Sequence, residues 1–78
     1  MRPADLAAAA LVRGDLRSGQ ARERRIAAGV SGADVARAMR PPVSPQAVHS
    51  WETGRTRPTV EHALAYGRVL AALAKRAA

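Results

Sequence analysis

The sequence predicts an all-α fold, a compact bundle of about five helices, and three observations favour it. Ala, Leu, Arg and Met are abundant, and no stretch alternates apolar and polar side chains as a surface strand would. Gly and Pro cluster at a few places and divide the 78 residues into short segments. Several segments begin with residues that typically start a helix, such as a hydroxyl residue followed by Pro. A chain of this size builds a modest core, so a partner subunit or a ligand would add stability.

The first helix is expected to run from Pro3 to about residue 12 and to end near Gly14. Its apolar content favours a role in packing or in dimer formation, with fraying at the chain terminus as the alternative. The apolar stretch is shorter and richer in Ala than the core of a typical signal peptide. No stretch approaches the roughly 20 apolar residues that a membrane-spanning helix needs. We therefore expect a cytoplasmic protein with no membrane partner.

Two short helices are expected next. Residues 20–28 form the first, and in it Arg25 lies on the same face as two alanines. Because that guanidinium then leans towards the interior, it needs an acidic partner. The next helix begins at Ser31, where Asp34 three residues later resembles a capping box, and it ends at the following pair of prolines. Its apolar stripe consists of Val35, Ala36 and Met39.

The fourth helix has the strongest local signals. Ser44 is an N-cap residue followed by Pro at the first helical position, and Gly54 ends the segment. Three residues recur at helical spacing and form the side that we expect to be buried: Ala47, Val48 and Trp51. About 180° away lies a polar stripe that carries no full charge at neutral pH: Gln46, His49, Ser50 and Thr53.

This polar stripe is unusual, because most exposed helical faces are rich in Glu and Lys. Uncharged hydrogen-bonding side chains suit the edges of DNA bases, since Gln can pair bidentately with adenine and Ser or His can donate or accept. A carboxylate in the same place would repel phosphate. An ordinary solvated face is the alternative interpretation of the stripe.

The last helix is expected to begin at Pro58-Thr59, where Thr can cap it, and to continue to the end of the sequence. Gly67 and the alanines around it would allow a second subunit to approach closely. Tyr66 is expected at the rim of the core with its hydroxyl in water. The predicted core line of this helix is Val60, Leu64, Gly67 and Ala71, with Leu70 and Leu73 beside it.

The net charge, the lack of Cys and the two His residues limit the classes of function that the chain can have. A net charge of +7 favours a polyanionic partner, nucleic acid before an anionic membrane, with a merely solvated basic surface as the alternative. Without cysteine the chain can form no disulfide and no thiolate metal site, and two His far apart make a poor zinc site. No nucleophile–base pair and no phosphate-binding glycine loop stands out. We therefore expect no enzymatic activity, metal, cofactor or small-molecule substrate.

Residues 20 to about 73 resemble the helix-turn-helix domain of phage lambda repressor and Cro, also called the XRE-like family. The matching pieces are the segment Arg25-Ile-Ala-Ala-Gly29-Val30-Ser31, the spaced apolar residues of the two central helices, and Trp51-Glu52-Thr53-Gly54 with the Arg55-Thr-Arg-Pro58 loop. An isolated Trp-Glu-x-Gly would be weak, but the combination is specific. The resemblance divides the chain into an N-terminal helical extension, residues 1–18, and a DNA-binding domain, residues 19–78.

The resemblance implies that residues 44–53 form the recognition helix, which lies in the major groove while the preceding helix crosses the backbone. Four residues are expected by position to contact bases: Gln46, Ser50, Pro45 and His49. Arg25 is expected to pair with Glu52, which then neutralises the inward-leaning guanidinium and fixes the tilt between two helices. Trp51 and Val48 fill the core beneath the recognition helix. A catalytic role for Glu52 is disfavoured, because no second acid or His is placed to assist it.

The resemblance also places Arg55 and Arg57 in a loop beside the phosphate backbone, where charge-assisted contacts would set the register without selecting a sequence. A merely basic loop is the alternative. Ser44 could cap its helix and also donate to a phosphate. The other candidate phosphate contacts are Thr53, Arg37, Arg40, Arg22 and Arg24.

The leading expectation is a sequence-specific double-stranded DNA-binding regulator of the repressor/Cro type. Because one recognition helix buries little surface, a homodimer is expected, with residues 6–12 and 69–73 as candidate dimer surfaces. Two departures from the family pattern favour the alternative, a protein-interaction module such as an antitoxin or a regulatory partner. Gly32 stands where the family often has a phosphate-contacting Gln, and the turn Arg40-Pro41-Pro42-Val43 is about two residues longer than usual.

Overall fold

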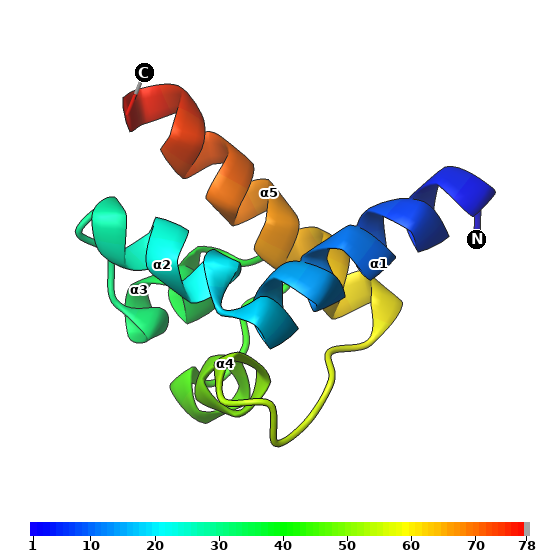
Figure 1. Cartoon of the computed structure of the whole chain (residues 1–78), viewed down its shortest axis with the longest axis horizontal. Coiled ribbons are helices and arrows are strands. Elements are labelled where there is room, and N and C mark those ends of the chain that lie inside the picture. The colour runs from blue at the N-terminus through cyan, green and yellow to red at the C-terminus, as the bar shows by residue number, and fades with distance from the viewer. Residues whose placement is uncertain (78) are drawn as a thin grey trace.

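A computed structural model describes residues 1–77, which form five α-helices and no strand. The helices are α1 (Pro3–Ser18), α2 (Gln20–Ala27), α3 (Gly32–Ala38), α4 (Pro45–Glu52) and α5 (Val60–Ala77). Figure 1 shows the two long helices α1 and α5 crossing, with α4 at the edge of the molecule away from the C-terminal end of α5. The predicted all-α bundle is confirmed. No helix among residues 1–77 is long and apolar enough to span a membrane.

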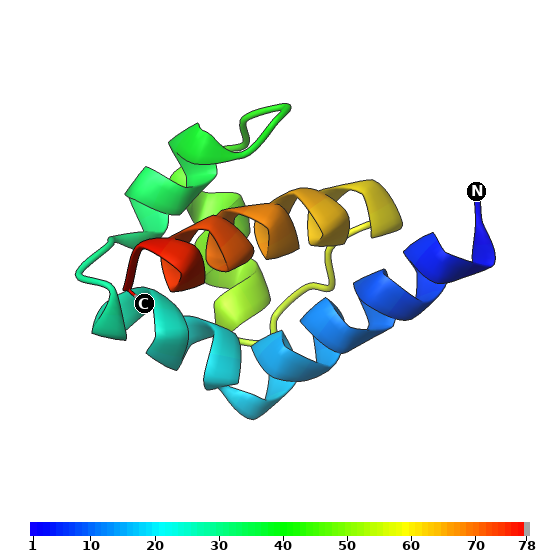
Figure 2. The same ribbon diagram turned by 90° about the horizontal axis from the view of Figure 1, so that it is seen from above.

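Helix α5 organises the packing of the bundle. It contacts α1, α2 and α3, and α3 packs against α4. Figure 2 shows α5 passing between α1 on one side and α3 on the other. Helix α4 also contacts α1, and its apolar side chains reach into the core, so one of its faces stays outward.

The core lies where the five helices meet. Its largest fully buried side chains are those of Val35, Met39, Val48 and Tyr66. Trp51 is 6 % exposed, and its ring lies edge-on to Tyr66 with 6.4 Å between the ring centroids. The apolar stripes that the sequence predicts for α3 and α4 both face this core.

Local chemistry sets the starts of the last three helices, as the sequence predicts. Ser31 Oγ accepts the N–H of Asp34, whose carboxylate accepts the N–H of Ser31, and together these bonds form a capping box. Ser44 Oγ accepts the N–H of Ala47 at 3.1 Å and caps α4. Thr59 Oγ1 caps α5 in the same way. Each cap satisfies an amide that a helix leaves without an internal partner, so these boundaries follow from nearby residues.

The predicted end of α1 is wrong. The helix passes through Gly14 and continues to Ser18, and Gly19 ends it with a φ of 88° in the left-handed region. Leu16 is 4 % exposed and packs in the core. Its burial outweighs the roughly 1 kcal/mol that a glycine costs within a helix, so the tertiary contact decides where α1 ends.

Three expectations for α5 are also wrong. Tyr66 lies fully buried rather than at the rim, because its hydroxyl donates a 2.7 Å hydrogen bond to Glu52 Oε2 inside the protein. Gly67 does allow a close approach, but the neighbour is α1 of the same chain: a Cβ there would lie 2.8 Å from Val12 Cγ2. The predicted core line is also displaced, since Ala71 is exposed. The buried residues of α5 are Ala63, Ala65 and Tyr66.

Candidate nucleic-acid interface

The outward face of α4 carries the predicted polar stripe. Gln46, His49 and Thr53 are exposed, and Ser50 is half-buried at the edge of the stripe. Trp51, on the opposite side of the helix, is 6 % exposed. No Asp, Glu, Lys or Arg interrupts the stripe. This face can therefore meet a polyanion without a repelling carboxylate.

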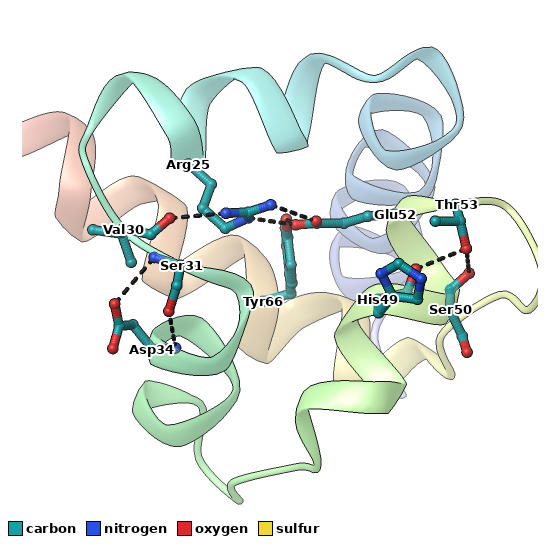
Figure 3. Close-up of polar contacts among 9 residues, drawn as sticks. All are labelled: Arg25, Val30, Ser31, Asp34, His49, Ser50, Glu52, Thr53 and Tyr66. Atoms are coloured by element: carbon teal, nitrogen blue, oxygen red, sulfur yellow. Dashed lines mark hydrogen bonds and ion pairs between the residues drawn. The ribbon is translucent and has the colours of Figure 1, made fainter.

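Part of the hydrogen-bonding capacity of this face is used within the helix. Thr53 Oγ1 donates to the His49 carbonyl at 2.8 Å, which Figure 3 shows together with the neighbouring Ser50. Gln46 is exposed, and its side chain makes no hydrogen bond within residues 1–77, so its amide group can donate and accept. Ser44 is exposed, and its Oγ only accepts in the helix cap, so its proton remains to be donated. Pro45 is exposed beside it.

A largely buried polar network fixes α4 against α2 and α5 (Figure 3). Arg25 of α2 donates from Nε and Nη2 to the two carboxylate oxygens of Glu52, both at 2.8 Å, and from Nη1 to the Val30 carbonyl at 2.9 Å. The Arg25 and Glu52 side chains are 11 % and 4 % exposed. The expected pair is therefore present. Tyr66, whose hydroxyl donates to the same carboxylate, is a third member that the sequence did not indicate.

The network shifts the protonation equilibria of its members. Burial raises the pKa of Glu52, but the hydrogen bonds from Arg25 and Tyr66 and the nearby positive charge together leave this pKa below its ordinary value. The hydrogen bond to Glu52 raises the pKa of Arg25 in spite of desolvation. Because the folded-state pKa of Glu52 is depressed, its contribution to stability is present above about pH 4.3, the unfolded value, and is lost as pH falls through the folded value. The pair is thus ionic at neutral pH.

The phenol of Tyr66 is expected to resist ionisation in the folded protein. Burial and the hydrogen bond to Glu52 raise the pKa of Tyr66 far above its ordinary value. Because Tyr66 is the single Tyr of the chain, ultraviolet absorbance follows its ionisation alone. The folded protein should show little phenolate at about pH 10 to 11, whereas the protein unfolded in guanidinium chloride should titrate near the ordinary value of about 10.

The raised pKa of Tyr66 also makes the stability of the fold depend on pH under alkaline conditions. Stabilisation by the Tyr66 hydroxyl should be complete below about pH 10 and should decrease as pH rises towards the folded-state pKa. Ionisation of the folded protein near pH 10 would contradict the buried hydrogen bond to Glu52.

The loop that follows α4 is fixed at both ends. The amide of Arg55 donates to the Ser50 carbonyl at 2.9 Å. At the other end Pro58 is buried, and its carbonyl accepts hydrogen bonds from Arg13 Nε and Nη2 at 3.0 and 2.8 Å. The side chains of Arg55 and Arg57 in this loop are exposed. Arg13 and Pro58 are 45 positions apart, so no local pattern could have indicated the role of Arg13.

The other arginines predicted to contact phosphate lie on α2, on α3 and in the turn after α3, and not in the loop after α4. Arg24 and Arg37 each form an exposed ion pair with an aspartate, and Arg22 is exposed on α2. Arg40 bends back, and its Nη1 donates to two carbonyls at the end of α3, both at 2.9 Å. Its side chain lines a hollow formed with α5 that contains no residue of α4. The structure therefore brings the two loop arginines next to α4 and holds Arg40 away from it.

The long turn between α3 and α4 is attached to the core. Residues 39–44 connect the two helices, and the N–H of Val43 donates to the Ala36 carbonyl at 3.1 Å. The Val43 side chain packs against the core cluster. At the start of α3, a Cβ on Gly32 would meet Val48 Cγ1 of α4 at an ordinary 3.6 Å, so packing alone does not require glycine there. The extra length of the turn does not separate α4 from α3.

The chain was compared with protein families, curated proteins and solved structures. A family model described as helix-turn-helix matches residues 22–74, which include α3, α4 and the loop after it but not α1. No curated protein and no solved structure gives a significant match. Within residues 1–77 no group of His, Asp and Glu is placed to hold a metal ion.

Proposed function

Because the chain belongs to the lambda repressor-like, or XRE, helix-turn-helix family of DNA-binding regulators, we propose that it is a sequence-specific transcriptional regulator of the repressor/Cro type. In this proposal α4 enters the major groove of double-stranded DNA. Gln46, His49 and Ser50 contact base edges, with Pro45 beside them, and the loop arginines bind phosphates. The protein acts by occupying an operator in the cytoplasm and not by catalysis.

The orientation of α4 carries this proposal. Its indole side is in the core and its uncharged polar side is exposed. Turning the helix about its axis would break the two hydrogen bonds from Arg25 and the one from Tyr66, all of which end on Glu52. The face is therefore held in place before DNA arrives, which reduces the entropy lost on binding.

We propose that the regulator binds as a homodimer to two half-sites about one helical turn apart, because one such module buries only roughly 600–1,000 Å² on DNA. Of the two candidate dimer surfaces, the one on α1 offers more apolar area. Leu6 and Leu11 are 51 % and 71 % exposed, whereas Val69 and Leu70 pack partly against the core. This difference favours α1 as the dimer surface.

Selection of DNA by the purified full chain tests the function. Random duplex fragments are incubated with the protein at near-physiological salt, and the retained fragments are sequenced. We expect one enriched motif with two related half-sites, bound at least about 10³-fold more tightly than bulk DNA. Equal retention of all sequences would contradict a sequence-specific regulator.

A protein-interaction module is the second candidate function, and one observation favours it. The hollow between the end of α3 and α5 is lined mainly by Ala, Val69 and Leu73, with Arg40 and Arg68 among its walls. Such a surface suits an acidic segment with apolar side chains. Under this alternative the selection experiment yields no motif, and the chain binds an acidic protein through α5.

A further inference from the structure

A hollow of about 300 Å³ lies beside the C-terminal end of α4, and α1 forms one of its walls. Leu16, Trp51 and Pro58 contribute the apolar side chains of its lining. Four of its nine lining residues are arginines: Arg13, Arg17, Arg55 and Arg57. No acidic residue of the described chain lines it. The hollow thus gathers positive charge directly after Thr53, the last residue of the polar stripe.

Arg17 is the arginine of this group that lies on α1 and forms no side-chain hydrogen bond or ion pair within residues 1–77. It is exposed in the last turn of α1. Arg24, by contrast, is paired with Asp15, the acidic residue nearest to Arg17 in sequence. A cation at the end of a helix gains little from the helix dipole when it is exposed. Stability of the single chain therefore does not account for a guanidinium at this position.

Arg13 has a different part in the arrangement. Its two hydrogen bonds to the Pro58 carbonyl tie the loop after α4 to the middle of α1. This contact keeps Arg55 and Arg57 beside Arg17. In the sequence, Arg55 lies 38 positions after Arg17. Arg13 is thus a positioning residue.

We propose that Arg17 binds a phosphate of the DNA backbone next to those bound by Arg55 and Arg57, so that α1 extends the DNA-binding surface beyond the helix-turn-helix itself. The inference rests on the proposed function, and it adds a helix that lies outside the matched residues 22–74. Three guanidinium groups with no carboxylate among them repel one another, and successive phosphates of a DNA strand placed beside them relieve that repulsion. A phosphate diester fits because a guanidinium donates to two of its oxygens at once.

The salt dependence of DNA binding tests this inference. The full chain is compared with its Arg17→Gln variant on the selected fragment over a series of salt concentrations. Loss of one phosphate contact should reduce the slope of log K against log salt by about 1 and should weaken binding several-fold at physiological salt. The preference for the selected fragment over a scrambled one should stay as it is, because phosphate contacts do not select sequence.

Arg76→Gln is the matched control. Arg76 is also an exposed arginine in the last turn of a helix, and Figure 1 places the end of α5 on the far side of the molecule from α4. This variant removes the same charge and the same interaction with a helix end, and its salt slope should equal that of the unaltered chain. A neutral methylphosphonate at the contacted position of the DNA should make the Arg17→Gln and unaltered chains equal in affinity.

Equal slopes for Arg17→Gln and Arg76→Gln, with the unaltered chain still selecting its fragment, would overturn the role of Arg17 and leave the proposed function standing. Failure of the unaltered chain to select any fragment would overturn both. Thermal unfolding of the three proteins should coincide, since neither arginine is bonded within the fold.

Discussion

Replacement of Glu52 by glutamine is expected to lower the free energy of unfolding by at least about 3 kcal/mol. The carboxylate is 4 % exposed and accepts two hydrogen bonds from Arg25 and one from Tyr66. A neutral amide leaves the guanidinium buried without a counter-charge, and its N–H₂ end cannot accept hydrogen bonds. A single core of this size supplies at most roughly 3–5 kcal/mol, so the variant should keep no more than about 2 kcal/mol of stability. Denaturant titration followed by the fluorescence of the single Trp and by circular dichroism measures the change.

Glu23→Gln is the control for this prediction. Glu23 is exposed in the first turn of α2, and it forms no ion pair within residues 1–77. Its replacement should cost at most about 1 kcal/mol. Equal losses for the two variants would mean that the Arg25–Glu52 pair does not hold α4 in place.

Replacement of Gln46 by alanine is expected to remove most discrimination at one base pair of each half-site. A bidentate side chain–base contact contributes about 1–3 kcal/mol of discrimination, which corresponds to about 5- to 150-fold in relative affinity. Because Gln46 is exposed and its side chain makes no hydrogen bond within residues 1–77, the fold should be unchanged. Competition between the selected fragment and single-base variants of it measures the loss.

Arg55→Ala provides the contrast for Gln46→Ala. This exposed arginine of the loop after α4 is proposed to bind phosphate, so its loss should weaken binding to all fragments alike and make the salt slope shallower by about 1. If Gln46→Ala kept full discrimination, or if Arg55→Ala altered sequence preference, the two assignments would be wrong.

The sequence was most informative where structure follows from residues close together in the chain. Ser31 with Asp34, and Ser44 with Ala47, specify helix starts through contacts three residues apart, and both starts were predicted. The buried and exposed sides of α4 were also predicted, because a helix of known start has a fixed angular spacing. The part of the candidate interface on α4 could thus be located before the structure was known. Its contacts with DNA remain predictions.

Features that depend on distant residues were missed. Burial of Leu16 carries α1 past Gly14, and no signal near the glycine indicates this. Tyr66 is buried because Glu52 lies opposite it, and that acceptor comes from a different helix. The Arg13 contact to the Pro58 carbonyl shows the same limit, since it joins α1 to the far end of the loop after α4. Pairings of this kind depend on how helices pack, which short-range patterns do not specify.

The polar face of α4, opposite Trp51, is proposed to meet the bases of DNA. Nuclear magnetic resonance of the isotope-labelled chain, titrated with the selected duplex, follows each backbone amide and so tests this contact residue by residue. We expect the largest shifts in residues 44–57 and little change in residues 68–76 at the end of α5. Unchanged signals from Gln46, His49 and Ser50 on saturation with DNA, with the shifts confined to other helices, would contradict it.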